Sequence, residues 1–179
     1  MILVGQKKAG LWFSMLSGIY DKINPKIYTK EMRAKLIREI EGERILDVGV
    51  GTGYTTGTFE KAVGIDINLK MLRRARYKGE LILADCMHAP FKEEVFDTVI
   101  SAGSLYYLPE PEKAMEIFYS LLKKNGVLLT ITPSLKILKI FVHIFSFEDL
   151  KKMYENAGFQ LEKIDKMRGI AYFCKGRKV

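Results

Sequence analysis

The 179-residue chain is poor in the residues that build metal centres and disulfide frameworks. Its two cysteines, Cys86 and Cys174, lie far apart in the sequence, and no CxxC pair occurs. Because a structural zinc site needs four closely grouped Cys or His ligands, we expect no bound metal. A disulfide stays open but is not implied, and a reducing compartment is the simpler setting.

Long hydrophobic runs, internal repeats and Pro/Gly-rich linkers are also missing. The composition, 48% hydrophobic and 28% charged, is typical of a globular protein, and we expect one domain over residues 1–179. The apolar segment Ala9–Tyr20 is too short to cross a bilayer, and it has no small-residue signal-peptidase site. We therefore expect a cytoplasmic protein without stable membrane insertion.

Acidic residues are in deficit, since 29 Lys and Arg face 21 Asp and Glu, which gives a formal net charge of +8. Such an excess points toward an anionic partner such as nucleic acid, a lipid surface or a phosphorylated ligand. The densest basic tract is Lys175, Arg177 and Lys178. Because most of the other basic residues are scattered pairs, a nucleic-acid partner stays open but is not favoured.

Short apolar runs alternate with helical patterns through most of the chain. The runs are continuous rather than alternating in polarity, which is typical of parallel strands that are covered on both faces. This order predicts an α/β fold with a doubly wound, mostly parallel sheet. We expect strands over 44–48, 62–67, 80–84, 96–102 and 127–132, and helices over 32–40, 54–61, 68–78 and 112–124, with Thr29 as the first N-cap.

The C-terminal part carries two local signals. Ser146 and Asp149 resemble a capping box, which predicts a helix from there to Asn156. The pair Arg168-Gly169 separates two apolar runs and predicts a hairpin. The last strand should therefore run antiparallel to the rest of the sheet.

Three glycines at alternate positions, Gly49, Gly51 and Gly53, follow the first strand and its acid, Asp47. Glycines permit positive φ and let a backbone approach a ligand closely, and amides at a following helix N-terminus favour a polar ligand. The dinucleotide fingerprint G-x-G-x-x-G fits neither frame, because its third position would fall on Tyr54 or Thr56. The loop therefore predicts a ligand without a pyrophosphate.

Acidic residues end the next two strands. Asp66 closes the second strand, where a carboxylate beside the glycine loop can accept hydrogen bonds from ribose hydroxyls. Asp85 follows the third strand, where it can accept from an exocyclic amine such as that of adenine. Cys86, next to it, offers a soft contact to a ring. The fourth strand leads through Ser101 to Tyr106 and Tyr107, of which Tyr106 lies nearer the strand end.

The successive stretches ILDVGVGTG, VGID, LILAD, FDTVISAGSLYYLP and LLKKNGVLLTITP resemble the motifs of class I methyltransferases that depend on S-adenosylmethionine. The resemblance is nearest to the branch that contains the ubiquinone/menaquinone biosynthesis enzymes. It implies a seven-stranded Rossmann-like sheet of order 3-2-1-4-5-7-6, an N-terminal helical cap over 1–41 and S-adenosylmethionine as cofactor. It implies cofactor contacts from Tyr20, Asp47, Gly49, Gly51, Gly53, Asp66, Ile67, Asp85, Cys86 and Ser101.

The motifs say less about the methyl acceptor. A D/N-P-P-Y/F motif is absent after the fourth strand, which argues against methylation of exocyclic amines, and the histidine that quinone-type enzymes often carry beside Tyr106–Tyr107 is absent too. We expect a small-molecule acceptor, with Tyr106 and His143 as candidate catalytic residues. An RNA or protein methyltransferase, and a SAM-binding module without activity, remain alternatives.

The segment 134–147 is rich in Leu, Ile and Phe, and it carries Lys136, Lys139 and His143. The pattern leaves three roles open: part of the core, a lid over an apolar acceptor, or a helix that touches a membrane.

Overall fold

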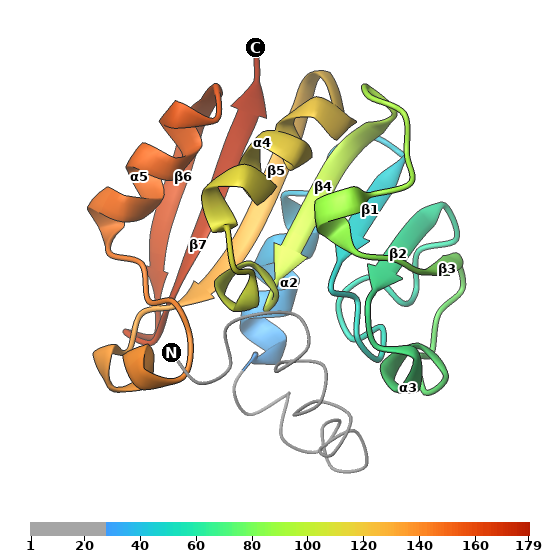
Figure 1. Ribbon diagram of the computed structural model, residues 1–179, viewed down its shortest axis with the longest axis horizontal. Helices are drawn as coiled ribbons and strands as arrows, with labels where there is room; N and C mark the ends of the chain where they lie inside the picture. The colour runs from blue at the N-terminus through green and yellow to red at the C-terminus, as the bar shows by residue number, and fades with distance from the viewer. Residues whose placement is uncertain (1–27) are drawn as a thin grey trace.

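Residues 28–179 are described by a computed structural model, and they contain one seven-stranded sheet (Figure 1). The order is β3-β2-β1-β4-β5-β7-β6; β7 is antiparallel to both of its neighbours, and the other pairs are parallel. The predicted order and the antiparallel last strand are thus confirmed. The strands are β1 (Ile45–Val48), β2 (Ala62–Asp66), β3 (Glu80–Leu83), β4 (Phe96–Ala102), β5 (Leu122–Pro133), β6 (Phe159–Met167) and β7 (Ala171–Lys178).

Helices cover both faces of the sheet, with α4 and α5 in front of it and α2 behind it in Figure 1. Strand β5 contributes to both cores: Leu128 packs in the cluster that contains α4 and α5, whereas Val127 and Leu129 pack in the cluster that contains α2. This two-sided burial explains why the strands read as continuous apolar runs. The helices are α2 (Lys30–Arg38), α3 (Leu69–Leu72), α4 (Pro111–Leu121) and α5 (Phe147–Asn156), with 3-10 segments η1 (Cys86–His88), η2 (Leu105–Tyr107) and η3 (Lys136–Ile140).

The predicted caps and the hairpin are confirmed. Thr29 Oγ1 accepts a hydrogen bond from Met32 N at 3.4 Å. Ser146 Oγ accepts from Asp149 N at 3.1 Å, and Asp149 Oδ2 accepts from Ser146 N at 2.9 Å, which completes a capping box. At Arg168–Gly169 the φ angles are +49° and +72°, as a tight hairpin turn requires.

The helix predicted over 54–61 is wrong, because this segment folds as consecutive turns. β-Branched threonines and glycines give it low helix propensity. Its backbone also bonds to a distant segment: Arg76 N donates to Thr52 O at 3.1 Å, and Lys78 N donates to Gly57 O at 2.9 Å. The same two hydrogen bonds hold residues 76–78 against the turns, so the helix predicted over 68–78 is only four residues long.

Helix α4 ends at Leu121, before the predicted residue 124, and β5 begins at Leu122 rather than at 127. The early start comes from pairing of Leu122 with Phe96 of β4. No local sequence pattern marks such a pairing.

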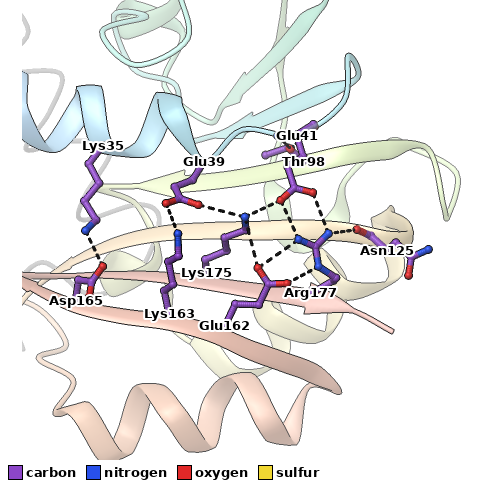
Figure 2. A network of polar contacts seen from close by, with 10 residues as sticks. All are labelled: Lys35, Glu39, Glu41, Thr98, Asn125, Glu162, Lys163, Asp165, Lys175 and Arg177. Atoms are coloured by element: carbon purple, nitrogen blue, oxygen red, sulfur yellow. Dashed lines mark hydrogen bonds and ion pairs between the residues drawn. The ribbon is translucent and has the colours of Figure 1, made fainter.

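A network of ion pairs fastens the chain after α2 to β6 and β7 (Figure 2). Glu41 accepts hydrogen bonds from both terminal nitrogens of Arg177, at 2.9 and 2.8 Å, and from Lys175 Nζ at 2.6 Å. Glu39 accepts from Lys163 Nζ at 2.5 Å and from Lys175 Nζ at 3.2 Å. Glu162 adds a second carboxylate to Arg177. The network joins elements that are far apart in sequence.

This network changes the interpretation of the C-terminal basic tract. The side chain of Lys175 is only 8% exposed and lies among three glutamates. Lys178 Nζ donates to Leu122 O at 2.8 Å and pairs with Glu94 at 3.2 Å. The tract is therefore neutralised within the chain and does not present a free basic surface to a polyanion.

Candidate cofactor and acceptor site

The three alternating glycines form the bend between β1 and the turns that follow it. All three have positive φ: +72° at Gly49, +56° at Gly51 and +82° at Gly53. A Cβ on Gly49 would lie 2.4 Å from Ser104 Cβ, and one on Gly53 would lie 2.7 Å from Arg76 O. A Cβ on Gly51 would meet nothing nearer than Met71 Cε at 3.4 Å. The bend is therefore packed tightly at both ends and open at Gly51, where a ligand can approach the backbone.

Asp66 holds the open part of this bend. Its Oδ2 accepts a hydrogen bond from Gly51 N at 2.9 Å, and its Oδ1 accepts from Asn68 N at 2.8 Å. Burial raises the pKa of this carboxyl group above its usual value, although the backbone donors oppose the shift. Asp66 is only partly buried, and its three backbone donors, Gly51, Ile67 and Asn68, leave one of its four lone-pair sites for a ligand.

The tips of β2 and β3 lie side by side, since Ala84 N donates to Asp66 O at 3.1 Å. Asp85 Oδ1 accepts from Met87 N at 2.8 Å and so begins η1. Two apolar side chains at these tips, Ile67 and Leu83, are 45% and 54% exposed. Exposed apolar surface beside two carboxylates suits a nucleoside, which has flat faces and polar edges. Cys86 is buried next to them, and burial raises the pKa of its thiol to about 12.

Asp47, the acid before the glycines, lies beneath the bend and is 2% exposed. Its Oδ2 accepts from Thr56 Oγ1 at 2.7 Å, and Thr56 Oγ1 lies 2.8 Å from the hydroxyl of Tyr77. Burial raises the pKa of Asp47 to about 7. This geometry gives Asp47 a positioning role through Thr56. Its direct contact with a cofactor stays a prediction.

Ser101 and Ser104 connect the end of β4 to the end of β1. Ser104 Oγ donates to Val48 O at 2.7 Å and lies 2.7 Å from Ser101 Oγ. Because Ser104 has one hydroxyl proton, Ser101 is the donor of the second bond. Ser101 is fully buried, so its expected contact with the cofactor stays a prediction. The sequence pattern does not single out Ser104, whose role is marked by its hydrogen bond to Val48 O and its close packing against Gly49.

The two candidate catalytic residues come together from different parts of the chain. His143 N donates to Tyr106 O at 3.1 Å, and the rings of Tyr106 and Tyr107 lie 4.5 Å apart. The imidazole of His143 stacks on Phe145, with ring centroids 5.9 Å apart. Its Nε2 atom is buried and has no hydrogen-bond partner among residues 28–179. A histidine thus lies beside the Tyr106–Tyr107 loop, although the sequence places none there.

The segment 134–147 divides into two parts. Val142 and Phe145 are buried, as the core interpretation predicts. Leu135, Ile137, Ile140 and Phe141 are exposed, so the core interpretation is wrong for η3 and its flanks. Tyr20, the remaining expected cofactor contact, lies outside the described residues, as does most of the predicted N-terminal cap.

A doubly wound sheet of this order, with a glycine bend after β1 and acids at the tips of β2 and β3, defines the class I methyltransferase fold. A solved structure from Thermotoga maritima, a SAM-dependent methyltransferase described as a possible histamine N-methyltransferase, is similar in fold. Its TM-score is 0.80 at 19% identity, over 93% of this chain and 98% of that one.

Residues 46–130 match the family model of a methyltransferase domain. The chain is 31% identical to the rice chloroplastic 2-methyl-6-phytyl-1,4-hydroquinone methyltransferase 1, over 92% of this chain and 57% of the relative. It is 27% identical to the ubiquinone/menaquinone biosynthesis C-methyltransferase of Methylococcus capsulatus, over 93% of this chain and 90% of the relative. The chain spans about half the length of the plant relatives that it matches. The matched domain, these relatives and the shared fold indicate a class I SAM-dependent methyltransferase.

S-adenosylmethionine is the cofactor of this family, and the site fits it. The bend is open at Gly51, the Asp66 carboxylate keeps an unused lone pair, and Ile67 and Leu83 expose apolar surface beside Asp85. These features match an amino acid, a ribose and an adenine, respectively.

Proposed function

We propose that the chain methylates a ring carbon of a hydroquinone that carries an isoprenoid tail. The observation that carries the proposal is the buried Nε2 of His143, which has no hydrogen-bond partner among the described residues, in a residue whose backbone N donates to Tyr106 O. The names of the rice and Methylococcus relatives, which refer to a phytyl hydroquinone and to quinone biosynthesis, support the same acceptor class.

The cofactor would lie along the tips of β1, β2 and β3. The backbone near Gly51 would hold its amino acid part, Asp66 its ribose hydroxyls and Asp85 its adenine amine. Ile67 and Leu83 would flank the adenine ring with apolar surface. When bound, S-adenosylmethionine supplies a methyl group on a positively charged sulfur, already activated for transfer.

The acceptor would lie between this bend and the Tyr106–His143 pair. Segment η2 begins directly after Ser104, whose side chain reaches Val48 O and Gly49, so Tyr106 is held close to the bend. The Nε2 atom of His143 is then available to accept the hydroxyl proton of the hydroquinone. A ring that loses this proton is more electron-rich and accepts the methyl group at carbon more readily. The hydrogen of that carbon would then leave as a proton, which restores the aromatic ring. The apolar side chains around His143 exclude water from the exchange.

The test is a methyl-transfer assay with a hydroquinone that carries a short isoprenoid tail, with the product located by mass spectrometry and NMR. We expect a new methyl group on a ring carbon. His143→Gln keeps a polar side chain but cannot take up the proton, so kcat should fall about 100-fold while cofactor affinity is unchanged. Glu155→Gln is the control, because the side chain of Glu155 is 51% exposed and pairs with Lys151 on the same helix. Methylation on oxygen, or full activity of His143→Gln, would contradict the proposal.

One cavity favours a second candidate, methylation of an RNA. It has a volume of about 790 Å³, and no acidic residue lines it among the residues described. Five of its lining residues are basic: Lys30, Arg33, Arg74, Arg76 and Lys78. RNA binding there should weaken steeply with added salt, whereas turnover of an apolar acceptor should not.

A further inference from the structure

Exposed apolar side chains gather at one place in the described chain. Between residues 135 and 147 the structure exposes Leu135 (41%), Ile137 (79%), Ile140 (64%), Phe141 (43%) and Phe147 (44%). We call these five side chains the η3 surface. The other large apolar side chains exposed within residues 28–179 are Ile67, Leu69 and Leu83 near the cofactor site and Val179 at the C-terminus. Five exposed apolar side chains within thirteen residues exceed ordinary scatter and indicate an interaction surface.

The η3 surface is presented by anchored backbone. Val142 and Phe145, which follow η3, are 4% and 7% exposed and pack into the protein. Val142 N donates to Leu138 O at 3.1 Å, and His143 N donates to Tyr106 O at 3.1 Å. The η3 surface is thereby attached to the loop that carries the proposed acceptor site. In Figure 1, η3 lies beyond the end of β5, at the edge of the sheet where the parallel strands end.

Charge accompanies this surface in a specific arrangement. A 3-10 helix has three residues per turn, so Ile137 and Ile140 lie on one side of η3. Lys136 and Lys139, both exposed, lie together on an adjacent side. Residues 134–146 contain no acidic residue. Asp149 is held by its hydrogen bonds to Ser146, and the charge of Lys139 helps to lower its pKa. The surface therefore combines apolar side chains with two lysines, and the acidic residues nearest to it in sequence, Glu148 and Asp149, lie at its Phe147 end.

We propose that the η3 surface docks on an anionic lipid bilayer and so presents the acceptor site to the membrane. Isoleucine and phenylalanine side chains would enter the boundary between headgroups and acyl chains, and the two lysines would lie among anionic headgroups. The proposal rests on the proposed function in one respect: an acceptor with an isoprenoid tail resides in a bilayer and must enter the site from there.

The test is co-sedimentation of the full chain with vesicles, without any acceptor. One set contains equal parts of phosphatidylcholine and phosphatidylglycerol, and the other contains phosphatidylcholine alone. We expect binding to the anionic vesicles and much weaker binding to the neutral ones. Lys136→Gln and Lys139→Gln should each lower the affinity about fivefold, the effect of about one surface lysine.

The double variant Ile137→Glu/Ile140→Glu should abolish binding to the vesicles, and Val179→Glu is the matched control, since Val179 is 62% exposed and distant in sequence. Cofactor affinity, measured by calorimetry, should be equal in both variants, which shows that both are folded. Equal vesicle binding by both variants, or no binding by the parent chain, overturns the proposal. The proposal is also overturned if the parent chain dimerises through the η3 surface and does not bind vesicles.

The outcome separates docking from the proposed function. If the chain binds anionic vesicles through the η3 surface but does not methylate a hydroquinone, the proposed acceptor is wrong and docking stands. If it methylates a soluble short-tailed hydroquinone but does not bind vesicles, docking is wrong and the acceptor class stands.

Discussion

Asp47 should make the stability of the cofactor-free chain fall as pH rises from 5 to 8. Its pKa is raised to about 7 in the folded chain because burial disfavours the charged carboxylate. An unfolded Asp titrates near its usual value of about 3.9, so in this window the folded state binds more protons. A raised carboxyl pKa therefore gives stability that is present at low pH and lost toward pH 7. With a pKa of about 7, the loss between pH 5 and 8 is about 2.5 kcal/mol.

The range from pH 5 to 8 separates the effect of Asp47 from that of the carboxylates whose pKa values are lowered. Several carboxylates have lowered pKa values, and their contribution is lost only when the pH falls below about 4.5; they are Glu39, Glu41, Asp97, Asp149 and Glu162. Asp66, whose pKa is raised, acts in the same direction as Asp47 and leaves a residual slope.

Asp47→Asn tests the reasoning, because an asparagine oxygen can still accept the bond from Thr56 Oγ1 but cannot ionise. Urea unfolding at pH 5, 6.5 and 8, followed by far-UV circular dichroism, should show parent and variant nearly equal at pH 5. At pH 8 the variant should be more stable by about 2.5 kcal/mol. Parallel curves for the two proteins across the window would refute the assigned burial of Asp47.

Three further outcomes follow from the site and the network. Gly51→Ala should raise the Kd for the cofactor at least tenfold in calorimetry, because its Cβ would fill the open bend. Gly169→Ala is the control, because Gly169 also has a positive φ but has no atom within 4 Å of its Cβ position. It should lower the stability by a similar amount and leave the Kd unchanged. Asp66→Asn should raise Kd about tenfold, since neutral acceptors make weaker hydrogen bonds, and an unchanged Kd would remove Asp66 from the site. Glu41, whose pKa is lowered to about 2 chiefly by Arg177, contributes stability that is lost as pH falls from about 4.5 to 2. Glu41→Gln should therefore lower the free energy of unfolding by about 1 kcal/mol in urea at pH 7, a value that allows for solvent screening of this partly exposed group. Glu43→Gln, which removes an exposed ion pair with Lys61, should not change it measurably.

The sheet was predictable because its signals are local. Strands buried on both faces read as continuous apolar runs, and the run in β1 or β4 needs no distant partner to be recognised. The turn at Arg168–Gly169 and the cap at Ser146 are likewise set by residues within three positions of each other. Strand order came from the family resemblance, which the structure confirms.

Contacts between residues that lie far apart in the sequence could not be predicted. The segment 54–61 fails to form a helix partly because Lys78 bonds to Gly57. The basic tract at Lys175 is neutralised by Glu41, which lies at the other end of the described chain. His143 reaches Tyr106 through a backbone hydrogen bond, so the apparent lack of a histidine near that loop was an artefact of sequence distance.

The acids at the tips of β1, β2 and β3 show how burial, rather than residue type, assigns roles. Asp47 is enclosed, and a carboxyl group with a pKa near neutrality and no accessible edge makes a poor partner for ribose hydroxyls. Asp66 is partly open and anchors Gly51 N, so it can support the bend and face a ligand at once. Asp47 instead accepts a hydrogen bond from Thr56. Thr56 lies in the turns that follow the bend, and the backbone of these turns bonds to residues 76–78. Ligand binding by the bend therefore depends on a polar layer beneath it, which is why replacing Asp47 should alter stability more than cofactor affinity.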